Sequence, residues 1–171
     1  MKYLEHRRHT ERTRPLDHIN QNGIDLAKKV APVVRTPSFT LTSSVPRAVE
    51  TALVLGHEVN RMDDLLFHYK PEVMGEIGDP SFKAIADAIK TGKYTASYSE
   101  DQLSLFREAL DEVKEGQTVL VVSHGIMVEI GLVAMFPEMN PSEWGKPFTY
   151  LEGYRVSYEN GEFKAPEILR T

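Results

Sequence analysis

The sequence contains no cysteine, only one tryptophan and no long hydrophobic run. The lack of cysteine excludes disulfide bonds, thiol nucleophiles and cysteine metal ligands, and its simplest explanation is a cytoplasmic protein. The charged N-terminal stretch has no apolar core of the kind found in signal peptides. No later apolar run approaches the roughly 20 residues that span a bilayer. We therefore expect a cytoplasmic protein with no membrane partner.

Acidic residues outnumber basic ones, 25 to 20, and the formal net charge of −5 argues against nucleic acid as a partner. The histidines do not have the spacing of metal ligands, so we expect neither a metal nor another cofactor. The N-terminus differs from the rest of the chain because basic side chains crowd there: Lys2, Arg7, Arg8, Arg12 and Arg14. Such a basic stretch attracts a small anion, for example a phosphate ester.

The length predicts one domain, residues 1–171, and the 41% hydrophobic content is enough for a core. Apolar and β-branched runs predict three strands, each followed by a helix. The strands are expected at 3–6, 39–42 and 118–122, and the helices at 20–34, 46–56 and 126–135. The run 118–122 is apolar without alternation, which is typical of a parallel strand covered on both faces. The pattern therefore indicates an α/β fold.

The remaining elements are predicted from shorter signals. We expect a short edge strand at 58–61, helices at 82–89 and 101–113, and two antiparallel strands at 148–157 and 162–168. Asn160-Gly161 is a strong hairpin signal between the last two strands. The stretch 91–99 is polar, and Ser99-Glu100-Asp101-Gln102 after it has the pattern of a capping box. Residues 67–80 hold two prolines and two glycines, so we expect an irregular segment over the functional site.

Two histidines follow predicted strands, in Arg8-His9-Thr10 and in Ser123-His124-Gly125. A parallel sheet gathers its ligand-binding groups at the carboxyl ends of its strands, so we expect both histidines at one site. Arg47 stands in the first turn of a predicted helix, where a positive charge opposes the helix dipole unless it binds an anion. A histidine nucleophile, a second histidine and two arginines together suit phosphoryl transfer.

These residues lie in three motifs that resemble those of the histidine phosphatase superfamily, also called the phosphoglycerate mutase-like fold. Arg8-His9-Thr10-Glu11 is similar to the family's Arg-His-Gly-Glu, and Ser123-His124-Gly125 to its distal histidine motif. Ser43-Ser44-x-x-Arg47-Ala48-x-x-Thr51-Ala52 is similar to its second arginine motif. The resemblance covers most of the chain. It implies a three-layer α/β/α sandwich around a mixed, mainly parallel sheet.

By this resemblance, His9 is the nucleophile that takes the phosphoryl group and forms a phosphohistidine. Imidazole is a good nucleophile when it is neutral at pH 7. His124 is expected to assist as a protonated imidazole that contacts the phosphate. The side chains expected to bind the phosphate are Arg8, Arg47 and His124, with Arg12 or Arg14 as a further ligand.

The family commonly takes the proton for the leaving group from an acidic residue after the second arginine motif. Met74-Gly75-Glu76-Ile77 resembles the family's Leu-x-Glu-Ile stretch, which assigns the general acid to Glu76. Glu72 and Asp79 are the alternatives. A carboxyl beside phosphate oxygens has its pKa raised by like charge and can stay protonated.

The sequence also departs from the family pattern. Thr10 stands where the family has glycine, Pro15 stands where mutase members place asparagine, and the long insertion of the glycolytic mutases is absent. We therefore expect a metal-independent phosphatase that acts on phosphomonoesters or on protein phosphohistidine, so that its partner is a phosphorylated small molecule or a phosphoprotein. Two alternatives stay open: a catalytically weak protein that binds phosphorylated ligands, and a small phosphoglycerate mutase-type phosphotransferase.

Overall fold

The computed structural model describes residues 1–171, which form one six-stranded sheet with helices on both faces. The strands are β1 (Lys2–Arg8), β2 (Phe39–Thr42), β3 (Arg61–Met62), β4 (Thr118–Ser123), β5 (Gly153–Glu159) and β6 (Glu162–Leu169). The helices are α1 (Gln21–Val30), α2 (Pro46–Val54), α3 (Pro71–Ile77), α4 (Phe82–Thr91), α5 (Lys93–Asp111) and α6 (Met127–Met135). No helix is both long enough and apolar enough to cross a membrane.

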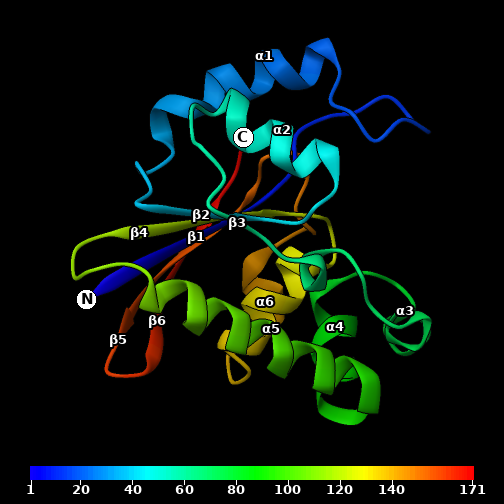
Figure 1. Ribbon diagram of the computed structural model, residues 1–171. Coiled ribbons are helices and arrows are strands. Elements are labelled where there is room, and N and C mark those ends of the chain that lie inside the picture. The colour runs from blue at the N-terminus through cyan, green and yellow to red at the C-terminus, as the bar shows by residue number, and fades with distance from the viewer.

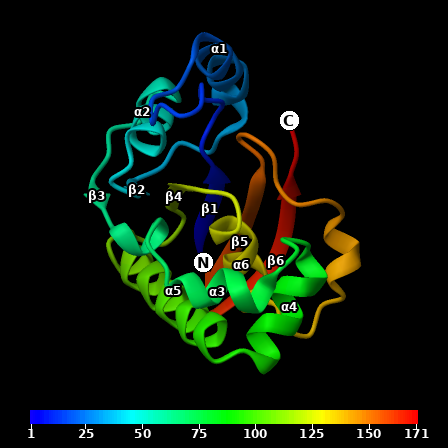
Figure 2. The same ribbon diagram turned by 90° about the vertical axis from the view of Figure 1, so that its right-hand side faces the viewer.

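The strand order is β3-β2-β4-β1-β5-β6, and Figure 2 shows β2 and β3 on one side of β1 with β5 and β6 on the other. The pairs β3·β2, β2·β4 and β4·β1 are parallel. Strand β5 pairs antiparallel with both β1 and β6. Arg8 lies opposite Ser123, and Thr42 opposite Val122. The carboxyl ends of β1, β2 and β4 therefore meet at one edge of the sheet.

Helices α1 and α2 cover one face of the sheet, and α3 to α6 cover the other (Figure 1). Strand β4 faces both layers. Leu120 and Val122 pack in the small cluster under α1 and α2, and Val119 and Val121 pack in the large cluster on the opposite side. The alternation explains why this strand is apolar throughout. The three-layer sandwich around a mixed, mainly parallel sheet is confirmed.

The structure differs from the predicted elements mainly in the second quarter of the chain. A regular helix, α3, replaces much of the irregular segment expected over 67–80, and α5 is continuous from Lys93 where a polar break was expected. The edge strand β3 begins three residues after the predicted start at 58, and β5 begins only at Gly153. The hairpin at Asn160-Gly161 is confirmed, because both residues have the positive φ angles, 55° and 84°, that such a turn requires.

Candidate active site

The carboxyl edge of the sheet brings the predicted histidines and arginines together. His9 directly follows β1 and His124 directly follows β4, and their ring centroids are 5.1 Å apart. A cavity of about 360 Å³ opens at this place. Six residues predicted from the sequence line it: Arg8, His9, Arg12, Arg14, Arg47 and His124.

The ring of His9 is oriented by its own backbone. Its Nδ1–H donates to the carbonyl oxygen of Thr10 at 2.6 Å, which leaves the lone pair on Nε2. Burial lowers the pKa of His9 to about 3, and the positive charges of Arg47 and Arg8 act in the same direction, while the bond to Thr10 opposes them. Arg47 Nε donates to His9 Nε2 at 3.1 Å. The lowered pKa favours a neutral His9 at pH 7, with the lone pair of Nε2 directed toward Arg47.

His124 is buried and hydrogen-bonded to the second motif. Its Nε2 lies 2.7 Å from Ser43 Oγ, and its Nδ1 is buried without a partner. Burial lowers the pKa of His124 to about 2, helped by the nearby His9 and by Arg47 and Arg8. Burial and the neighbouring positive charges therefore favour a neutral His124 in the free site, whereas a protonated imidazole was expected beside a phosphate. A bound phosphate dianion would oppose this effect and favour the protonated form.

The side-chain hydroxyl of Thr51 links the second motif to the first. Its Oγ1 donates to the carbonyl oxygen of Arg47 at 2.6 Å and accepts from the amide of Thr10 at 3.0 Å. Arg47 is the second residue of α2 and is only 6% exposed, so its guanidinium occupies a fixed place beside the His9 ring. The hydrogen bond from the Thr10 amide to Thr51 explains why Thr51, one helical turn after Arg47, belongs to the second motif.

The Arg8 guanidinium is held on the other side of the cavity. Its Nη1 donates to the carbonyl oxygen of Phe148 at 2.8 Å, and its Nε is buried without a partner. A Cβ atom at position 125 would lie 3.1 Å from Arg8 Cζ, which is tighter than ordinary contact. Gly125 therefore allows the guanidinium to lie flat against the turn after β4.

Asp17 supplies a negative charge to this positively charged site. Its carboxylate accepts from Arg47 Nη1 at 2.5 Å and lies 3.5 Å from Arg12 Nη1. Asp17, Arg12 and Arg14 all belong to the loop between β1 and α1, and Arg12 forms an isolated bridge with Ile19 across it. In the free protein, an internal carboxylate thus occupies donors that could bind a phosphate.

Glu76 lies outside the cavity, so the assignment of this residue as general acid is wrong in this structure. Its carboxylate accepts from the amides of Lys93, Tyr94 and Thr95 at 2.9, 3.1 and 2.7 Å, and from Thr95 Oγ1 at 2.7 Å. These bonds, led by those from Thr95, lower its pKa to about 2. The carboxylate is ionised and caps the first turn of α5. The alternatives Glu72 and Asp79 do not line the cavity either.

The one carboxyl that lines the cavity belongs to Glu129. It is 2% exposed, and burial raises its pKa. One carboxylate oxygen accepts from the amide of Ile126 at 2.6 Å, and the other accepts from the amide of Phe148 at 2.7 Å. Glu129 thereby fixes the start of α6 and the chain segment that contacts Arg8. Both of its oxygens are thus engaged by backbone amides.

Aromatic rings complete the cavity, and sequence reasoning missed them. The ring of Phe67 lies 4.9 Å from that of His124, and Arg47 Cζ lies 5.4 Å from the Phe67 centroid. The ring of Tyr150 lies 5.8 Å from that of His9, and Tyr69 is a further lining residue. These side chains come from segments outside the helices and strands, where the sequence has no hydrophobic periodicity. The only sequence signal for them is an aromatic residue close to a proline or glycine.

Neither family models nor curated proteins include a match to this sequence, whereas many solved structures match it. The phosphoserine phosphatase of Entamoeba histolytica, in complex with 3-phosphoglyceric acid, has a TM-score of 0.72 at 20% identity, covering 100% of this chain and 98% of that one. The mycobacterial glucosyl-3-phosphoglycerate phosphatase has a TM-score of 0.67 at 18% identity, with coverages of 98% and 97%.

A phosphoglycerate mutase from Bacillus anthracis is also similar, with a TM-score of 0.68 at 14% identity, covering 95% of this chain and 90% of that chain. All three similarities extend over nearly the full length of both proteins. The chain therefore has the same fold as these two phosphatases and this phosphoglycerate mutase.

Proposed function

We propose that the protein is a metal-independent phosphatase that hydrolyses phosphorylated small molecules through a phosphohistidine on His9. The observation that carries this proposal is the state of the His9 ring. Its Nδ1–H is held by Thr10, its Nε2 faces Arg47 at 3.1 Å, and its pKa is lowered to about 3. A neutral imidazole with an oriented lone pair beside guanidinium groups is the arrangement that phosphoryl transfer to nitrogen requires.

The reaction has two steps. The Nε2 lone pair of His9 attacks phosphorus, the bond from phosphorus to the leaving oxygen breaks, and its electron pair stays on that oxygen. Water then attacks phosphorus and the P–N bond breaks, which returns the electron pair to Nε2. One hydrogen of the water stays on the inorganic phosphate, and the other neutralises the alcohol product. Arg8 and Arg47 stabilise the charge on the phosphoryl oxygens in both steps.

The similar structures support this class of substrate. Two of the three named proteins are phosphatases, for phosphoserine and for glucosyl-3-phosphoglycerate, and the third is a phosphoglycerate mutase. Hydrolysis is favoured over mutase activity because the chain lacks the long insertion of the glycolytic mutases. A cytoplasmic location, a phosphoprotein substrate and the roles of Arg12 and Arg14 as phosphate ligands are further parts of the proposal.

The test is the release of phosphate from p-nitrophenyl phosphate in the presence of EDTA. We expect turnover that survives chelation and disappears in His9→Ala. The matched control is His57→Ala, which removes a histidine that lies outside the cavity and is expected to leave turnover unchanged. Rapid quenching should trap an acid-labile, base-stable phosphoprotein only when His9 is present. Vanadate binding without turnover would indicate instead a protein that only binds phosphorylated ligands.

A further inference from the structure

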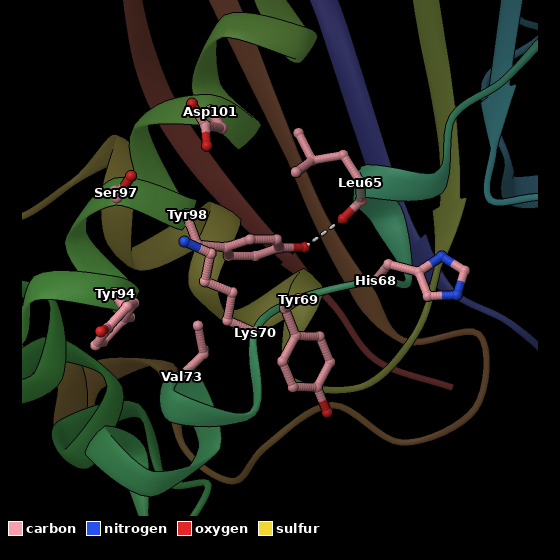
Figure 3. A pocket seen from close by; sticks show the side chains of 9 residues that line it. All are labelled: Leu65, His68, Tyr69, Lys70, Val73, Tyr94, Ser97, Tyr98 and Asp101. Carbon is pink, nitrogen blue, oxygen red and sulfur yellow. Dashed lines mark hydrogen bonds between the residues drawn. The ribbon is translucent and has the colours of Figure 1, made fainter.

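A second cavity adjoins the active site, and Tyr69 lines both. In Figure 3, the ring of Tyr98 reaches across from α5 toward Leu65, with Tyr94 and Tyr69 on either side and Val73 between them. The cavity has a volume of about 380 Å³, which lies within the range of small-molecule sites. Nothing in the two-step reaction above uses it.

Five of the nine residues that line this cavity are hydrophobic or aromatic and are suited to an aromatic ring, and the others are His68, Lys70, Ser97 and Asp101. The hydroxyl of Tyr98 donates to the carbonyl oxygen of Leu65 at 2.6 Å, so the part of Tyr98 left to contact a ligand is its apolar ring. The rings of Tyr69 and Tyr98 lie edge to face, with centroids 6.2 Å apart. Val73 adds an aliphatic surface. Aromatic pairs with such geometry gain stability beyond the area they bury, so a further ring would pack favourably here.

A chain of rings leads from the nucleophile toward this cavity. The centroid of His124 lies 5.1 Å from that of His9, and the Phe67 centroid lies 4.9 Å beyond it. Tyr69, two residues after Phe67, forms part of the wall of both cavities. A phosphate ester bound at His9 can therefore direct its alcohol part past Phe67 and Tyr69 into the second cavity.

The chemistry of the active site points to the same kind of alcohol. Glu76 caps α5, each oxygen of Glu129 accepts an amide hydrogen, and the carboxylate of Asp17 is paired with Arg47 and Arg12. Each carboxyl near the cavity is therefore engaged in other contacts, and none stands as a ready proton donor. Without such a donor, a phenolate leaves far more easily than an alkoxide, because it is the weaker base. The electron pair of the broken P–O bond then rests on the phenolate oxygen, which takes its proton from water.

We propose that the second cavity binds the aromatic part of an aryl phosphate substrate. The claim that this ligand is a substrate rests on the proposed function, since its phosphate must lie at His9. The binding itself is independent of turnover. The binding follows from the aromatic rings of the lining and from the continuity through Tyr69. The choice of an aryl ester follows from the lack of a ready proton donor.

The test uses phosphonates, whose P–C bond the protein cannot hydrolyse. Calorimetry compares the dissociation constants of inorganic phosphate, phenylphosphonate and 4-biphenylylphosphonate. We expect the biphenylyl compound to bind about tenfold more tightly than the phenyl compound, the ratio that burial of one further ring would supply. Ser97 is an exposed residue of the lining, and the variant Ser97→Trp is designed to fill the cavity with an indole ring. The preference for the biphenylyl compound should disappear in this variant. Ser104→Trp, an exposed position on α5 outside the cavity, should retain it.

Equal affinities of the unaltered protein for the two phosphonates would overturn the proposal without any variant. Retention of the preference in Ser97→Trp would overturn it as well, and inorganic phosphate binding shows whether that variant has an intact phosphate site. If the preference is present but p-nitrophenyl phosphate is not hydrolysed, the subsite stands and the phosphatase function fails. If hydrolysis occurs without any preference, the function stands and the subsite fails.

Discussion

The contact between Gly125 and Arg8 makes position 125 informative about phosphate binding. In Gly125→Ala, the new methyl group would lie 3.1 Å from Arg8 Cζ and 3.2 Å from its Nη1, so the guanidinium must shift by a few tenths of an ångström. A partly lost charge-assisted hydrogen bond costs about 1 kcal/mol, which corresponds to a dissociation constant for inorganic phosphate roughly fivefold higher. Isothermal titration calorimetry measures this change.

The matched control is Gly75→Ala. Gly75 lies within α3 and is exposed, and a Cβ there has no atom within 4 Å, so phosphate affinity should remain unchanged. Alanine also favours helix over glycine, so the unfolding midpoint of this variant should stay equal or rise. Unchanged affinity in both variants would mean that Arg8 does not hold phosphate in the position described.

Individual residues were predictable where a motif directly follows a strand. His9 and His124 come after runs that are recognisable as strands, and Arg47 lies in the first turn of a helix that begins with Pro46, so their meeting follows from parallel topology. The aromatic lining was not predictable, because Phe67 and Tyr150 stand in segments whose path depends on long-range packing. Asp17 was missed for the same reason: its partner Arg47 is 30 residues away.

One side chain, Glu76, accounts for two wrong predictions: the polar break before α5 and the identity of the general acid. The stretch 91–99 has weak helix formers and a glycine, so local propensity predicts a break before Ser99. In the structure, Glu76 accepts amide hydrogens at the start of α5 from 17 to 19 residues away and allows the helix to begin at Lys93. The same bonds hold Glu76 away from the active site. Local sequence reasoning cannot include a cap that comes from another helix.

Glu76→Gln separates the capping role from a role in catalysis. The amide keeps an acceptor oxygen but loses the charge that favours a helix N-terminus, so the thermal unfolding midpoint should fall by a few degrees. We expect kcat for p-nitrophenyl phosphate and for an alkyl phosphate to stay within about twofold, whereas loss of a general acid typically costs about a hundredfold or more. An unchanged midpoint with a large fall in kcat for the alkyl ester would restore Glu76 as the acid.

Three buried histidines should make the folded state sensitive to mild acid. His6, at the back of the site, is fully buried between Tyr154 Oη and Ser123 Oγ, and burial lowers its pKa to about 3. The pKa values of His9 and His124 are lowered to about 3 and about 2. Between pH 6.5 and these values the unfolded chain binds protons that the folded protein does not, so stability must decrease as the pH falls.

The expected decrease in unfolding free energy from pH 6.5 to pH 5.5 is at most about 4 kcal/mol, at roughly 1.4 kcal/mol per pH unit for each of the three histidines. Glu129 reduces it, because burial raises the pKa of that carboxyl and so acts in the opposite direction. Urea unfolding at pH 6.5, 6.0 and 5.5 measures the slope. Stability that is constant or increases on acidification would show that the histidines are not buried as neutral groups.

The carboxylate of Asp17 pairs with Arg47 and Arg12. Because Asp17 belongs to the same chain, it competes with phosphate at a fixed effective concentration. Any phosphate that engages these arginines must first displace it, and the cost of that displacement is the same for every ligand. Asp17 therefore weakens binding of all phosphate esters by one common factor. It sets the ligand concentration at which the site fills, while the choice between one ester and another is left to the surfaces that contact the alcohol.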